Sequence, residues 1–198
     1  MSKKLSVCAV VLALVVVLAA PAAAATTFDF GVKAGASLFK NDWSDNDGSE
    51  KTLIRPTFGA FALVNLTPMI AIQPELNYLT TGLWWDDPGG KFVETYGYLH
   101  IPVLVRARLM QQGPIVPVVF AGPALGILLS AKWEGDDVKD LFKTTDFGVD
   151  LGVGGEIALN TMKLLLDFRY YMGLTDVYED TKFSMKNRGF ILTAGLIF

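Results

Sequence analysis

Hydrophobic and polar residues alternate over the segment 28–38 of this chain. Every second residue from Phe28 to Leu38 is apolar, and the residues between them are polar, charged or glycine. Successive side chains of a β-strand point to opposite faces, so this pattern predicts a strand with one apolar face. Strands are usually about five or six residues long, whereas a tilted strand that crosses a bilayer needs about nine to eleven. The length therefore favours a membrane-spanning strand.

Seven further strands follow from the same pattern, and the segments between strands alternate in length. Short turns are expected at 67–69, 110–113 and 160–162, and long loops at 40–55, 82–94, 132–145 and 175–186. An up-and-down barrel with both chain ends on the side of the short turns produces this alternation. We therefore predict an all-β fold: an eight-stranded antiparallel up-and-down transmembrane β-barrel with four long extracellular loops and three short periplasmic turns. The expected strands are 28–38, 57–66, 70–78, 99–109, 114–131, 146–157, 164–172 and 187–198.

The segment 114–131 is almost continuously apolar, and its length alone would permit a transmembrane helix. Proline and glycine disfavour a helix interior, and this segment contains three prolines and two glycines. We predict a strand with a bend or bulge near Gly122 and Pro123.

The last strand ends the sequence on an aromatic residue, and one of its faces is wholly apolar. This strand resembles the C-terminal signal strand of bacterial outer-membrane β-barrels, which the barrel-assembly machinery reads. The resemblance implies that the alternating apolar positions form the assembly signal. These positions are Phe190, Leu192, Ala194, Leu196 and Phe198.

The first 25 residues have the features of a cleaved secretory signal peptide. Lys3 and Lys4 precede an apolar run that ends before Pro21, and four alanines follow. The run is short for a membrane anchor, so cleavage after Ala24 or Ala25 is expected. Residues 26–198 would then form one barrel domain. Cys8, the single cysteine, leaves with the signal, so we expect no disulfide, thiol nucleophile or cysteine-based metal site.

The charge of the cleaved chain argues against a nucleic-acid partner. Without the signal the chain has 15 basic and 20 acidic residues, a net charge of −5, and no basic stripe. The apolar content of the full sequence, 52%, fits either a membrane barrel or a dense soluble core, so a soluble secreted binding barrel remains an alternative.

Charged residues of both signs fall on the inward face of the expected strands. The interior of an eight-stranded barrel is only wide enough for side chains to fill, and a buried charge is costly without a partner. We therefore expect a plug of ion pairs, with a narrow ion path or ligand pocket as the alternative. The expected lumen charge network comprises Lys33, Glu75, Arg106, Arg108, Asp150, Glu156, Asp167 and Arg169.

His100 is the single histidine and also lies on an inward face. A lipid-modifying enzyme would need this histidine beside a serine and a carboxylate. The serines after the signal lie on or near other strands and loops, so a hydrogen-bonded lumen histidine is the simpler interpretation and no catalytic residue is assigned. The serines considered are Ser37, Ser44, Ser49, Ser130 and Ser184.

The expected long loops carry acidic and tryptophan residues but no cofactor motif. An EF-hand fails on the segment 43–54, because its first ligand position is Trp43 and its twelfth is Ile54. We expect no metal and no cofactor. We expect the acidic loop to be solvated and to lie near lipopolysaccharide. The partners expected at the long loops are lipopolysaccharide and a surface ligand held by the tryptophans. The residues concerned are Asp42, Asp45, Asp47, Glu50, Trp43, Trp84, Trp85 and Trp133.

Several short motifs together resemble the porin-family (PorT-like) outer-membrane β-barrel domain of Gram-negative bacteria. They are the segments 73–76 (QPEL), 98–103 (YLHIPV), 121–123 (AGP) and 145–148 (TDFG), with the closing strand. The resemblance implies a bacterial outer-membrane location, contact with membrane lipid and lipopolysaccharide, and a non-enzymatic structural or surface-interaction role. A small solute channel and a lipid-modifying enzyme remain alternatives. His100 stands where the family pattern has an acidic residue.

Overall fold

Eight long strands form the body of the computed structural model, which describes residues 27–43, 51–87, 90–178 and 185–198. Within these ranges there are also two short strands, β2 (Lys51–Thr52) and β7 (Asp136–Asp137), and one 3₁₀ turn, η1 (Lys139–Leu141). The 3₁₀ turn lies in the segment 132–145, which was expected as a long loop. The long strands are β1 (Thr27–Trp43), β3 (Ile54–Asn65), β4 (Ile70–Asp87), β5 (Gly90–Arg108), β6 (Val116–Trp133), β8 (Thr145–Ala158), β9 (Lys163–Gly173) and β10 (Met185–Ile197).

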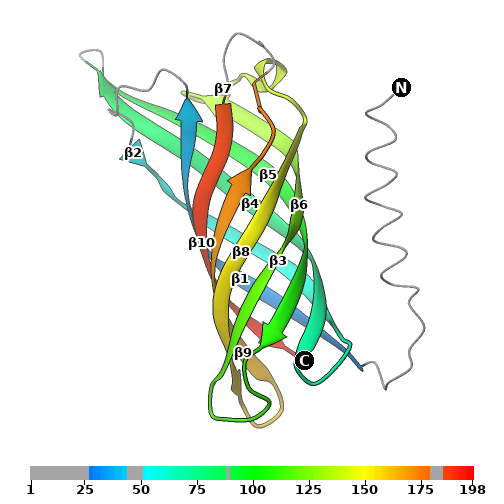
Figure 1. Cartoon of the computed structure of the whole chain (residues 1–198). Helices are drawn as coiled ribbons and strands as arrows, with labels where there is room; N and C mark the ends of the chain where they lie inside the picture. The colour runs from blue at the N-terminus through cyan, green and yellow to red at the C-terminus, as the bar shows by residue number, and fades with distance from the viewer. Residues whose placement is uncertain (1–26, 44–50, 88–89, 179–184) are drawn as a thin grey trace, which may run out of the picture.

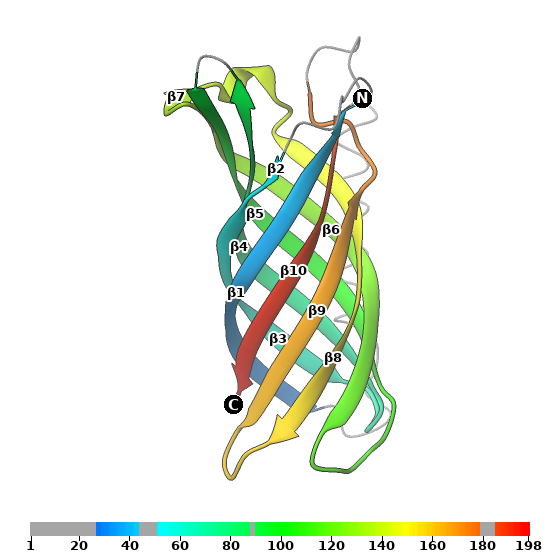
Figure 2. The same ribbon diagram turned by 90° about the vertical axis from the view of Figure 1, so that its left-hand side faces the viewer.

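The long strands close into an antiparallel barrel (Figures 1 and 2). Each pairs with its neighbours in chain order, and the ring closes where β1 pairs with β10, with Gly31 opposite Ile197. β1 begins and β10 ends at the end of the barrel that carries the short turns. The predicted eight-stranded antiparallel barrel is confirmed.

The two faces of the strands differ in polarity as the alternation predicts. Phe28, Phe30 and Val32 point outward and are 59%, 61% and 52% exposed, whereas Lys33 on the same strand is buried in the lumen. An outer apolar surface of this kind faces lipid in membrane barrels. Among the described residues, no helix is long and apolar enough to span a membrane.

Strands β4 and β5 are longer than expected and extend through most of the segment predicted as the loop 82–94. Their pairing continues from Leu83 opposite Glu94 to Asp87 opposite Gly90, and the hairpin projects beyond the barrel body (Figure 1). Aromatic and β-branched residues favour paired strands, and this segment contains Trp84, Trp85 and Val93. The two tryptophans therefore lie on a strand and not in a loop.

No register shift occurs near Gly122 and Pro123, where the sequence predicted a bend or bulge. Gly122 lies opposite Asp150 and Pro123 opposite Val149 in an uninterrupted register with β8. A Cβ atom at Gly122 would clash with the carbonyl oxygen of Val103, so glycine permits a close approach of β5 and β6 here. The register shift lies instead between Gly97 and Tyr98 of β5, where Leu129 of β6 is the extra residue.

Candidate functional site: the charged lumen

The structure brings all eight residues of the expected lumen charge network into the barrel interior. None is more than 8% exposed. They lie on β1, β4, β5, β8 and β9, so the network joins five of the strands that close the barrel. Every one occupies an inward position of the two-residue alternation.

Glu75 accepts hydrogen bonds from two cations and two amides. Arg169 donates through Nη1 to Oε2 and through Nη2 to Oε1, both at 2.9 Å, and Lys33 Nζ lies 2.7 Å from Oε2. The side-chain amides of Gln73 and Asn77 also donate to this carboxylate, at 2.7 and 2.8 Å. Such charge-assisted and bidentate bonds are the strong class of hydrogen bond.

Arg106 is the centre of a second group of ion pairs nearer the short turns. Its Nε lies 3.1 Å from Glu156 Oε1, and Nη1 and Nη2 each lie 3.1 Å from Asp167 Oδ1. Gln73 joins the two groups, because its Oε1 accepts from Arg106 Nη1 at 3.3 Å while its amide donates to Glu75. Arg108 Nε completes the group at 2.9 Å from Glu156 Oε2.

Formal charges balance within the network, which has four cations and four carboxylates. The guanidinium carbons of Arg106 and Arg169 each also lie 5.4 Å from the ring centroid of Phe120. Burying an ion costs several kcal/mol, and only close partners offset that cost, so the removal of one member costs about 3–5 kcal/mol. The arrangement fills the middle of the lumen with mutually dependent charges.

His100 is bound to the same network. Its Nε2 lies 2.9 Å from Asp150 Oδ2, and its ring packs edge-on against Tyr171 at a centroid distance of 5.1 Å. Ser37 donates instead to the backbone carbonyls of Arg55 and Thr80. Within the described ranges no serine hydrogen-bonds to His100, whereas Ser44, Ser49 and Ser184 lie outside those ranges.

An apolar cluster fills the lumen on the far side of His100, toward the long connections. It includes Phe39, Tyr96, Leu128, Phe142 and Val177, all buried. Phe142 follows η1 and forms an isolated bridge with Tyr178 after β9, so two connections between strands contribute to this cluster. The cluster places packed apolar side chains in the lumen on that side.

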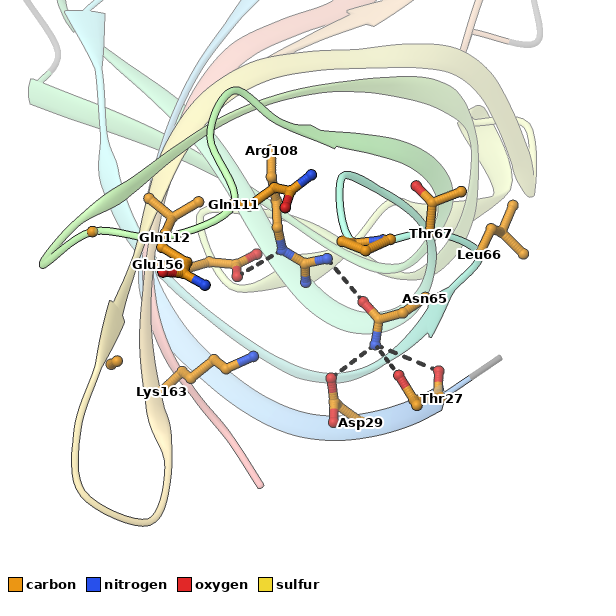
Figure 3. A pocket seen from close by; sticks show the side chains of 14 residues that line it. Thr27, Asp29, Asn65, Leu66, Thr67, Arg108, Gln111, Gln112, Glu156 and Lys163 are labelled. Atoms are coloured by element: carbon orange, nitrogen blue, oxygen red, sulfur yellow. Dashed lines mark hydrogen bonds and ion pairs between the residues drawn. The ribbon is translucent and has the colours of Figure 1, made fainter. Parts of the chain in front are cut away.

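The lumen opens at the other end, among the short turns, into a cavity of about 880 Å³ (Figure 3). Arg108 and Glu156 lie at its inner end. The lumen thus has three zones: an apolar cluster, an ion-pair network and an open polar cavity.

The chain matches the family described as the outer membrane protein beta-barrel domain over residues 20–179. It belongs to this family. The predicted bacterial outer-membrane location is therefore confirmed, and the alternative of a soluble secreted barrel is wrong.

Solved structures of small outer-membrane barrels have the same fold. Neisserial surface protein A is 19% identical, with a TM-score of 0.54, over 85% of this chain and 95% of its own. OprG from Pseudomonas aeruginosa is 11% identical, with a TM-score of 0.57, over 87% of this chain and 97% of its own. At these identities the similarity establishes the fold. No curated protein sequence matches the chain.

The terminal strand of this outer-membrane barrel presents its expected signal positions to the outside. Phe190, Leu192 and Phe198 are 46%, 55% and 63% exposed, on the face that meets lipid. The backbone N–H of Phe198 donates to the Phe30 carbonyl at 2.8 Å, so the last residue is attached to β1.

Sequence analysis missed a second polar group, centred on Asp146. This carboxylate accepts from Tyr171 Oη at 3.0 Å, and from Asn187 Nδ2 and Thr175 Oγ1 at 2.9 Å. The alternation of β10 could have identified Asn187, which lies two residues before the inward Gly189. No local pattern indicates that Phe142 and Val177, which lie outside the long strands, enter the lumen.

Proposed function

We propose that this protein is a non-enzymatic outer-membrane barrel whose lumen is closed to solutes, and that it acts through its structure and its outer surface. The observation that carries the proposal is the continuous hydrogen-bonded network from Lys33 to Arg108. It spans the lumen without an unpaired cation among its four. A solute would have to break several charge-assisted bonds to pass.

The long connections, on this proposal, face the cell exterior and the short turns face the periplasm. Exposed apolar side chains support a binding role for the outer end: Trp133, Leu129 and Leu141 are 45%, 46% and 49% exposed. Exposed apolar patches mark interaction sites, and lipopolysaccharide or a surface ligand is the partner that we propose. The acidic positions 45, 47 and 50 lie outside the described residues, as do the side chains of Asp42, Trp43 and Trp85.

Further finer assignments remain predictions. The PorT-like placement rests on the short motifs at 73–76, 98–103, 121–123 and 145–148, and cleavage of residues 1–25 rests on their sequence pattern. Recognition of the terminal strand by the barrel-assembly machinery rests on its exposed apolar face. A His100-dependent enzyme has less support: the ring is bonded to the Asp150 carboxylate and packed on Tyr171, but no serine of the described ranges hydrogen-bonds to it.

Swelling of proteoliposomes tests the proposal. Vesicles that contain the folded barrel should swell in small sugars or amino acids no faster than empty vesicles, because the network blocks the lumen. An established general porin serves as the positive control. Swelling that depends on solute size would instead identify the protein as a small solute channel.

A further inference from the structure

The cavity at the short-turn end, which we call the vestibule, is a pocket and not a pore. Its volume of about 880 Å³ falls within the range of about 300–1,000 Å³ that is typical of small-molecule sites. Arg108 closes its inner end, with Nε 2.9 Å from Glu156 and Nη1 3.0 Å from Asn65 Oδ1 (Figure 3). A ligand could therefore enter from the short-turn side and stop at Arg108.

A lysine ammonium in the vestibule has no bonding partner. Lys163 begins β9, is exposed, and forms no hydrogen bond or ion pair with any described residue. Its amine points into the cavity (Figure 3). The positive charge is available to a ligand.

A carboxylate on another strand is only partly satisfied. Asp29 on β1 accepts one hydrogen bond at Oδ2, from Asn65 Nδ2 at 2.9 Å, and its other oxygen bonds to no described residue. The two charged residues lie on strands separated by β10, because Gly31 faces Ile197 and Ile197 faces Lys163. Two strand spacings put their backbones about 10 Å apart, and no ion pair joins the two side chains in the structure.

The other charges of the vestibule are already neutralised. Arg108 is paired with Glu156, which also holds Arg106. The rest of the lining is neutral and combines apolar residues with hydrogen-bonding groups, including the amides of Gln111 and Gln112. A purely anionic or purely cationic ligand would meet one charge of its own sign, whereas a ligand with both charges would satisfy Lys163 and Asp29 together.

We propose that the vestibule binds short peptides with a free ammonium and a free carboxylate group, with Lys163 contacting the carboxylate and Asp29 the ammonium. A short peptide carries these two charges at opposite ends of its chain, and the cavity of about 880 Å³ that both residues line has room for it. The proposed orientation of the barrel, on which this step rests, exposes the vestibule to the periplasm. Free peptides and the stem peptides of the cell wall share this chemistry.

Titration of the purified, folded barrel with trialanine in a non-ionic detergent tests the assignment. We expect saturable binding by calorimetry, with chemical-shift changes at the amides near Lys163 and Asp29. Amidation of the peptide's carboxyl end, or acetylation of its amino end, should each weaken binding about tenfold through loss of one charge-assisted bond.

Two variants test whether Lys163 contacts the carboxylate end of the peptide and Asp29 the ammonium end. Lys163→Gln should bind free and amidated trialanine with equal affinity, and Asp29→Asn should bind free and acetylated trialanine equally. Lys132→Gln, an exposed lysine at the end of β6, is the matched control and should behave as wild type. Heat-modifiable migration on a gel verifies that each variant is folded.

Absence of saturable binding at millimolar peptide, or equal binding of the doubly capped peptide, would overturn the assignment. Co-sedimentation with purified cell-wall sacculi, competed by trialanine, identifies the wall as the source; binding of free trialanine without co-sedimentation identifies soluble peptides. The result of the titration depends neither on the orientation of the barrel in the membrane nor on whether the lumen conducts. Failure of the vestibule assignment is therefore distinguishable from failure of the closed-lumen proposal.

Discussion

Glu75 is the residue on which most of the lumen network converges. Its two oxygens accept from Lys33, Arg169, Gln73 and Asn77, and it is fully enclosed by them. The alternation along β4 places this carboxylate inside the barrel. The sequence could not identify its partner Arg169, which lies 94 residues away, because that contact depends on barrel diameter and strand stagger.

Replacement of Glu75 by Gln should destabilise the barrel by about 3–5 kcal/mol, because Lys33 and Arg169 lose the carboxylate charge on which both depend. Urea unfolding in detergent, followed by gel migration, measures the change. Glu134→Gln is the control, since Glu134 is exposed and its contact with the Val93 N–H survives in glutamine. Equal stability of Glu75→Gln and the control would show that the network contributes little.

At the scale of the element, local sequence patterns predict where some strands end. The ends of other strands depend on pairing with the neighbouring strand. Pattern identified every long strand, and it identified the outward face wherever apolar and polar residues alternate. It failed for the β4–β5 hairpin, because the segment 82–94 contains turn-forming residues while its cross-strand pairs continue to Asp87 and Gly90. It also failed to locate the register shift at Gly97, since a shift depends on the facing strand.

Deletion of Phe198 should deplete the folded barrel from the outer membrane. The residue ends the apolar face of β10, is 63% exposed, and bonds through its backbone to β1 at the closing seam. The amount of heat-modifiable protein in isolated outer membranes measures how much of the barrel is folded. Phe28→Ala removes a similarly exposed aromatic side chain from β1 and should leave assembly near normal, while a normal level after deletion of Phe198 would refute the signal assignment.

The whole molecule combines a lipid-facing surface with two different lumen ends: an apolar cluster near the long connections and a polar vestibule near the short turns. Alternation and loop lengths predicted the transmembrane barrel, and the resemblance of the closing strand and the short motifs predicted the outer membrane. The division of the lumen into an apolar cluster, an ion-pair network and a vestibule was not predictable, because it depends on which inward residues share a level around the closed ring.

Epitope labelling on intact cells tests the orientation of the barrel. A tag inserted at Gly135, in the turn between β6 and β7, should be accessible to antibody without permeabilisation. Tags at Gln112 and Asn160, in short turns, should be accessible only after the outer membrane is opened. The reverse pattern would place the vestibule outside the cell. Tags at Gly48, Gly90 and Asp180 should be accessible on intact cells as well; Gly90 begins β5, whereas Gly48 and Asp180 lie outside the described residues.

Single-channel recording in planar bilayers tests the closed lumen most directly. The purified wild-type barrel should show no stable porin-like conductance, because Arg106 and Arg169 hold their carboxylates across the middle of the lumen. Arg106→Ala should be destabilised, since Glu156 and Asp167 lose a shared partner. A steady, ion-selective conductance in the wild type, with selectivity altered in a fully folded Arg106→Ala variant, would contradict the closed lumen and identify a small channel.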